Sequence, residues 1–340
     1  MTARFQADQI SAELCVELSA LDSRNPFLTP AYAEAMQDLG AQAWLFYLKD
    51  GGCLREGCFG FLRTGRLNRS LEIHSLPELA APNIFWSGLT DFCRRAGVSH
   101  LNVGSFASSR VEIPSLAGQT YRRSRVEHVL SLQESSVGSG LSSNHRRNIQ
   151  KAEKAGVCIE RSISAQACRE HVLLQNASME RRLTRGESVT IDSQIRTPLA
   201  LVQRGSGEFF RAVRPGQVLS SVLVLRAPLG AYYHSAGTSR EGMSLGASQF
   251  LILRVAEILR TEGLDLFNLG GAESSNAGLE RFKVGFGTRP VHLGAAQFYL
   301  GSRLQKGIGA VVDLLRHFTY ARVSRAQQSA APVKHQSVQP

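Results

Sequence analysis

The sequence has no long hydrophobic run and no regular spacing of cysteines. Its longest apolar stretches, such as 250–253, are far shorter than the ~18 residues that a membrane-spanning helix requires. The first residues are polar, include early acidic side chains and lack a continuous apolar segment, so we expect no signal peptide. Six cysteines are scattered without the CxxC spacing of metal sites and disulfide frameworks. We therefore expect a cytoplasmic protein with reduced cysteines and no metal site. Cys53 and Cys58 flank a predicted turn, and a disulfide between them is the alternative.

Several signatures of catalysis and nucleic-acid binding are missing as well. There is no Gly-x-Ser-x-Gly elbow and no cysteine next to a histidine in sequence, so we predict no covalent enzyme nucleophile. No helix-turn-helix, zinc-finger or RNP pattern accompanies the formal net charge of +11. A basic surface attracts phosphates on tRNA or small molecules, or it reflects an arginine-rich composition alone. A nucleic-acid-binding protein proper remains an alternative.

Length and patterning predict a two-domain α/β protein. The 340 residues are 43% hydrophobic and 20% charged, which is typical of globular proteins, and the length suits two domains. Helix-like patterns at 8–20 and 30–39 precede alternating strands, with a turn at Asp50-Gly51-Gly52. After a small-residue linker near 135 a similar order of helices, meander, helix and strand follows. We predict the following division: an N-terminal domain at 1–135, a C-terminal domain at 136–323 and a disordered tail at 324–340.

The segment 240–248 joins a predicted strand to a long helix. Glycine leaves room for a ligand to approach the backbone, and the free N–H groups at a helix N-terminus favour an anion. The segment therefore predicts a cofactor-binding loop that contains Arg240, Gly242, Gly246 and Ala247. A capped helix with glycines in its loop is the alternative reading.

A basic helix is predicted at 144–156. Arg147, Lys151 and Lys154 have the spacing of one helix face, and Ile149 and Ala152 face the opposite way toward a core. Such a face either docks phosphates, for which arginine gives bidentate contacts, or is simply solvated.

A predicted strand at 264–269 ends in a glycine-rich polar loop, and a short helix follows it. Loops at strand ends are where α/β sheets usually hold ligands. In the short helix Lys283 lies between apolar neighbours, where an ammonium neutralises a phosphate or polarises a carbonyl oxygen. A lysine that only extends its charge to solvent is the alternative.

Four motifs in order carry a family resemblance over about residues 140–300: RRNIQKAEKAGV, YYHSAGT, LDLFNLGG and GLERFKVGFG. Together they resemble Fem-type aminoacyltransferases and the related GNAT domain called acetyltransferase 6. The resemblance implies an α/β (α+β) fold of two tandem GNAT-like domains, with mixed, mostly antiparallel sheets flanked by helices. The long coiled-coil arm of some Fem proteins has no counterpart here, and the glycines of the cofactor loop are four apart instead of closely spaced.

The implied activity is transfer of an acyl or aminoacyl group to an amine, which forms an amide. The donor would be acyl-CoA or aminoacyl-tRNA, used as a cosubstrate with no tightly bound cofactor. The acceptor would be an amine on a cell-envelope precursor, a polysaccharide or a small metabolite, and tRNA is a candidate partner. A non-catalytic GNAT-fold module that binds a ligand is the alternative.

The site prediction combines the chemistry with the resemblance. Amide formation needs a neutral amine, an oxyanion donor and a proton outlet, so we predict direct attack. Lys283 matches the lysine of the family's Phe-Lys-x-x-Phe-Gly motif and is the first predicted catalytic residue. His234 is the second, as a proton acceptor or relay, with a structural histidine as the alternative. The predicted substrate-binding residues are Arg146, Arg147, Asn148, Tyr233, Asn268, Glu273 and Phe282.

Overall fold

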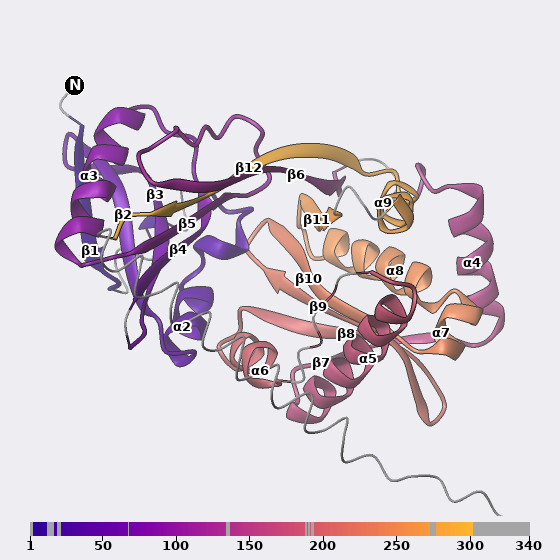
Figure 1. The fold of residues 1–340 in the computed structure, drawn as a ribbon. Coiled ribbons are helices and arrows are strands. Elements are labelled where there is room, and N and C mark those ends of the chain that lie inside the picture. The colour runs from indigo at the N-terminus through magenta and orange to yellow at the C-terminus, as the bar shows by residue number, and fades with distance from the viewer. Residues whose placement is uncertain are drawn as a thin grey trace, which may run out of the picture.

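The described strands join one continuous sheet of twelve, in the order β1-β2-β3-β4-β5-β12-β6-β11-β10-β9-β8-β7 (Figure 1). Helices cover the sheet, and most neighbouring strands are antiparallel, as the predicted fold class requires. The computed structural model describes residues 3–11, 17–18, 22–66, 68–133, 137–187, 189, 191, 194–272 and 277–301.

The N-terminal half is an antiparallel meander that ends in a parallel strand. Its strands, paired in this order, are β1 (Arg4–Gln9), β2 (Gln42–Asp50), β3 (Cys53–Thr64), β4 (Arg69–Leu76) and β5 (His100–Ser105). Its helical elements are η1 (Pro26–Leu28), α2 (Pro30–Asp38) and α3 (Pro82–Arg95). The predicted turn between β2 and β3 is confirmed: Gly51 and Gly52 adopt φ of 57° and 87°, values that glycine reaches without strain.

The C-terminal half repeats this order. Its strands are β7 (Cys158–Ser162), β8 (Gly207–Arg214), β9 (Gln217–Arg226), β10 (Gly230–Thr238) and β11 (Leu266–Ala272), of which β10 and β11 are parallel. Its helices are α4 (Ser143–Lys154), α5 (Ala165–Thr184), α6 (Arg196–Gln203), α7 (Arg240–Leu245), α8 (Ala247–Thr261) and α9 (Ala277–Val284). In both halves a helical crossover connects two parallel neighbours, α3 in the first and α7 with α8 in the second.

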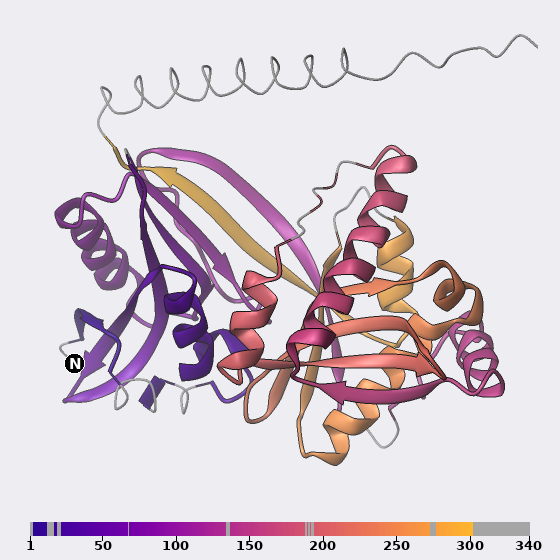
Figure 2. The same ribbon diagram turned by 90° about the horizontal axis from the view of Figure 1, so that it is seen from below.

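Two long strands connect the halves, because each pairs with a strand of the other half. Strand β6 (Gln119–Ser131) follows β5 in the chain but pairs with β11 of the other half. Strand β12 (Arg289–Tyr299) follows α9 but pairs with β5, and β6 and β12 also pair with each other. Figure 2 shows these two strands running side by side between the halves. The segment 289–299, which we assigned to the C-terminal domain, therefore completes the sheet of the N-terminal half.

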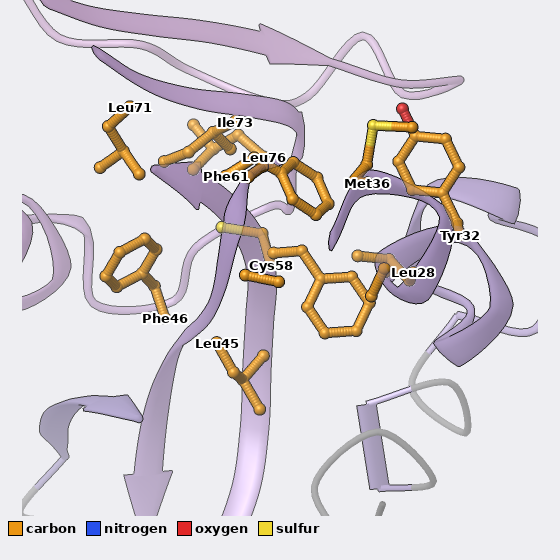
Figure 3. Close-up of a cluster of buried hydrophobic side chains, with 14 of the residues drawn as sticks. Leu28, Tyr32, Met36, Leu45, Phe46, Cys58, Phe61, Leu71, Ile73 and Leu76 are labelled. Atoms are coloured by element: carbon orange, nitrogen blue, oxygen red, sulfur yellow. The ribbon is translucent and has the colours of Figure 1, made fainter. Parts of the chain in front are cut away.

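Each half has its own apolar core. In the N-terminal half, side chains from β2, β3, β4, η1 and α2 interdigitate, with Phe46 and Phe61 fully buried (Figure 3). In the C-terminal half α8 packs on β8 and β9, and Arg254 lies on the partly exposed side of α8. Its guanidinium lies 2.7 Å from the Glu153 carboxylate of α4 and 2.6 Å from that of Glu257. This ion-pair network holds α4 against α8.

Some local predictions need correction or lie outside the described residues. The helix-like pattern at 8–20 is wrong at its start, because residues 4–9 form β1, an edge strand paired with β2. Cys53 and Cys58 are both free thiols, so the alternative of a disulfide between them is wrong. The end of the predicted C-terminal domain, 302–323, and the tail at 324–340 lie outside the described residues.

Candidate functional site

The parallel strands β10 and β11 pair over only three residues each and leave an opening beyond them. Gly230–Tyr232 pair with Leu266–Asn268, and the pairing ends there although both strands continue. Each strand is irregular at this point: the register of β10 on β9 skips His234, and that of β11 on β6 shifts between Asn268 and Gly271. A bulge releases backbone groups from the ladder and redirects side chains. The two bulges face one opening.

A pocket of about 780 Å³ occupies this opening. Strand residues from Tyr232 to Thr238 and from Leu269 to Gly271 line it, and α5 and α9 provide further walls. Ser248, in the first turn of α8, also reaches it. Four predicted site residues line the pocket: Tyr233, His234, Phe282 and Lys283.

Lys283 is a buried cation at the edge of this pocket, with 4% of its surface exposed. Its ammonium donates a hydrogen bond to the backbone carbonyl of Gly271 and lies 5.9 Å from the centre of the Tyr233 ring. Burial lowers the pKa of Lys283 to about 8, and the nearby Glu127 carboxylate acts in the opposite direction. A lysine with this pKa is mostly protonated at pH 7 and changes charge just above it.

Asn268 supports the bulge of β11 from below. Its amide donates to the Glu127 carboxylate at 2.7 Å and its side-chain oxygen accepts from the Gly270 N–H at 2.8 Å. Arg125 lies 3.0 Å from the second Glu127 oxygen. Asn268 and Glu127 are fully buried, and neither lines the pocket. The predicted substrate-binding residue Asn268 therefore lies behind the pocket wall.

The helix that carries Lys283 is held from behind by α4. His145 donates from Nε2 to the Phe282 carbonyl at 2.8 Å, and its Nδ1 lies 3.1 Å from the Ser142 hydroxyl. A Cβ at Gly285 would lie 2.5 Å from the His145 ring, so glycine permits this close packing. Burial lowers the pKa of His145, which favours the neutral ring that this packing needs. Sequence analysis missed His145, although it stands in the same motif as Arg146.

A chain of hydrogen bonds runs from the pocket into the core behind β10. The His234 ring lies 3.4 Å from the hydroxyl of Ser235, which is 2.9 Å from one nitrogen of His171. The other nitrogen of His171 lies 3.0 Å from the Ser221 hydroxyl, and burial lowers the pKa of His171 to about 3. His171 is therefore neutral and fixes Ser235. The His234 side chain is exposed to the first pocket, but protein atoms surround much of the ring. This desolvation lowers the pKa of His234 below its ordinary value.

A second pocket, of about 580 Å³, adjoins the first on the side of the N-terminal half. Tyr232 and His234 line both pockets. Its other walls come from η1, α2, α6 and strands β3, β4, β5, β6 and β12; they mix apolar side chains with charged and polar ones such as Glu72, His74 and Arg123. These two residues of β10 therefore form part of the wall of both pockets. Sequence analysis did not predict the second.

Arginines at the C-terminal end of α5 form a cationic wall of the first pocket. Arg181, Arg182 and Arg185 line the first pocket together with Glu187. Glu187 lies 2.7 Å from Arg182 and 2.8 Å from Arg185, so its charge is offset by both. The wall retains a positive charge that suits phosphates.

The predicted cofactor loop is a short helix in the structure. Residues 240–245 form α7, and Gly246, with φ of 74°, joins it to α8. A Cβ at Gly242 would lie 2.3 Å from the Leu219 carbonyl oxygen, and one at Gly246 would lie 2.5 Å from that of Asn148. Packing thus explains both glycines. Ala247 is fully buried, and none of the four predicted cofactor residues, Arg240 included, lines the first pocket.

The predicted substrate residues of α4 also lie elsewhere. Arg146 and Arg147 are exposed, and neither they nor Asn148 line the two large pockets. Ile149 and Ala152 are buried, as the helix pattern predicts. Glu273 lies outside the described residues.

With this geometry in view, comparison with known families is informative. Residues 139–284 match the Acetyltransf_6 family model, an acetyltransferase (GNAT) domain. The C-terminal half contains a GNAT acyltransferase domain. The match confirms the resemblance drawn from the four motifs and places the enzyme class with the acyltransferases. No curated protein matches the sequence.

Solved structures extend the shared fold to nearly the whole chain. FemX aligns with 89% of this chain and 99% of its own at a TM-score of 0.67 and 12% identity. A tandem GNAT protein from the clavulanic acid biosynthesis pathway aligns with 88% of this chain and 99% of its own at 0.52 and 15%. L-PGS from Bacillus licheniformis aligns with 87% and 94% at 0.53 and 13%. At these identities the likeness shows the fold, and tandem GNAT architecture is confirmed.

Among the described residues, no helix is both long and apolar enough to cross a membrane. Within the same residues, no cluster of three or more His, Cys, Asp or Glu side chains has an arrangement that could hold a metal ion.

Proposed function

We propose that the protein is an N-acyltransferase that moves an acyl group from an activated ester or thioester to an amine and forms an amide. The observation that carries this proposal is the pair of pockets that meet at Tyr232 and His234. Direct transfer requires the donor carbonyl and the acceptor nitrogen to come within about 3–3.5 Å. Two cavities with one shared boundary provide that arrangement, with the donor in the β10–β11 opening and the acceptor beside the N-terminal half.

The chemistry follows from the groups at the boundary. The amine nitrogen attacks the carbonyl carbon, a C–N bond forms, and the carbonyl oxygen becomes an oxyanion. The Lys283 ammonium and the backbone N–H groups at the β10 bulge are the donors that stabilise this charge. The C–O or C–S bond to the carrier then breaks, and the amine gives up a proton. The neutral His234 imidazole accepts this proton and passes it to the departing oxygen or sulfur, so the carrier leaves as a free hydroxyl or thiol.

The donor carrier is anionic in this proposal. Arg181, Arg182 and Arg185 line the donor pocket, and Ser248 in the first turn of α8 also lines it. Guanidinium groups and a helix N-terminus both favour phosphate. Both candidate carriers are phosphorylated: coenzyme A has phosphates at the far end of the pantetheine arm from the thioester, and tRNA has them along its backbone. The acceptor is an amine of a peptide or glycan precursor or of a small metabolite, and the protein acts in the cytoplasm.

The test is acyl transfer by the purified protein. Acyl-CoAs and charged tRNAs are offered with a pool of amines, and amide products are identified by mass spectrometry, with ribonuclease added to one series. Lys283→Ala should lower kcat about 100-fold or more, the usual effect of removing an oxyanion donor. Lys151→Ala, on the exposed face of α4, is the matched control and should retain activity. Binding of donors without any amide product would contradict the proposed enzyme activity.

A further inference from the structure

The donor pocket has a composition that restricts which acyl group it accepts. We infer that the acyl group is uncharged, apolar and longer than acetyl. This inference rests on the proposed function, since it assigns the substrate class of the same site.

Apolar side chains from three helices converge on the pocket and stay partly exposed there. They are Met179 of α5, Met243 of α7, and Leu279 and Phe282 of α9. Met243 is 51% exposed, a high value for a large apolar side chain. Apolar surface of this kind, gathered in one cavity, marks a site that an apolar ligand covers. An acetyl group is too small to contact all three helices.

The two methionines add a second indication. The sequence has four methionines, and two of them line this pocket. The methionine side chain is unbranched and adapts to the shape of its partner, which suits a flexible alkyl chain. The position of this surface beside Phe282 and Lys283 makes it continuous with the proposed reaction centre.

The charges of the lining disfavour an aminoacyl group. Among the described residues of the lining, Arg181, Arg182, Arg185 and Lys283 are cationic, and Glu187 is the sole carboxylate. Glu187 already forms ion pairs with two of these arginines. An α-ammonium on the acyl group would lie near the Lys283 ammonium, and the arginine-paired Glu187 is the sole carboxylate of the described lining that could offset it. An uncharged acyl group has no such cost.

The experiment compares acyl-CoAs of increasing chain length with charged tRNA as donors. Burial of one methylene contributes about 0.8 kcal/mol, which is about a fourfold gain. We expect kcat/KM to rise about threefold to fourfold per methylene from acetyl-CoA upward until the pocket is filled. Alanyl-tRNA should be the poorer donor. A value for acetyl-CoA equal to that for octanoyl-CoA, or a preference for alanyl-tRNA, would overturn the inference.

Two variants of α5 test whether the chain-length preference arises in this pocket. Met179→Trp places a larger side chain in the pocket and should move the preferred chain length downward by several methylenes. Leu173→Trp changes the same helix at a position that is 69% exposed and outside this pocket, and it should leave the preference unchanged. Equal chain-length profiles for the two variants, both with wild-type thermal midpoints, would place the acyl group elsewhere.

Calorimetry separates failure of this inference from failure of the proposed function. Each acyl-CoA is titrated into the protein without an amine and compared with free coenzyme A. If no donor is turned over but affinity rises with chain length, the acyltransferase proposal fails and the apolar acyl site stands. If donors are turned over but affinity and kcat/KM are independent of chain length, the acyl-site inference fails alone.

Discussion

Replacing Lys283 by methionine should make the protein more stable at pH 7 while it loses activity. Methionine retains the length of the side chain and removes an ammonium that is 4% exposed. Folding lowers the pKa of this lysine from 10.5 to about 8. At 1.36 kcal/mol for each pKa unit, holding the charged form in the fold costs about 3 kcal/mol at pH 7. Loss of the hydrogen bond to Gly271 offsets about 1 kcal/mol of the gain. The net expectation is a gain of about 2 kcal/mol.

The stability difference between Lys283→Met and wild type should depend on pH. Below pH 8 the lysine is protonated in both the folded and unfolded states, and the full cost is present. Between pH 8 and 10.5 the unfolded state binds more protons than the folded state, so wild-type stability rises with pH. The advantage of Lys283→Met should therefore be largest below pH 8, disappear near about pH 9.5 and become a disadvantage of about 1 kcal/mol by pH 10.5.

Urea denaturation of wild type and variant at several pH values measures this difference. Lys151→Met, on the exposed face of α4, is the matched control and should show no comparable gain. A variant that is less stable than wild type at pH 7, or an advantage that is constant up to pH 10.5, would refute the assignment of Lys283 as a buried, strained charge. The same variant should lower kcat, because it removes the proposed oxyanion donor.

Two further predictions concern residues near the site. Glu127→Gln removes the carboxylate that raises the pKa of Lys283, so the alkaline decline of kcat should move to lower pH; an unshifted decline in the pH–rate profile would show that the two groups are not coupled. Gly246→Ala should lower the free energy of unfolding by more than the roughly 1–2 kcal/mol of left-handed backbone strain, because its Cβ would meet the Asn148 carbonyl oxygen 2.5 Å away. Gly156→Ala, with φ of 72° and open space around it, measures the strain alone, and equal losses in urea denaturation would contradict the packing role of Gly246.

The sequence by itself determined several local elements in both halves of the chain. Helix α4, the turn at Gly51 and Gly52, and the short helix that carries Lys283 all follow from periodicity and residue type. The order of four motifs was enough to identify the family resemblance, because comparing motifs requires no knowledge of contacts in the fold. The sequence predicts a cofactor loop at 240–248, but Gly242 and Gly246 suit both a ligand loop and close packing, and only the neighbouring Leu219 and Asn148 decide between these.

Tertiary structure decided how these elements make a site. Strands β6 and β12 pair across the two halves, and such pairing depends on partners far apart in the chain. Glu127 gives no local sign of its burial, yet in the fold it lies beneath β11 and influences the pKa of Lys283. The second pocket exists only because the N-terminal half meets β10 at Tyr232 and His234. Charge, burial and pocket shape are set by what packs against a residue, and those neighbours come from the fold.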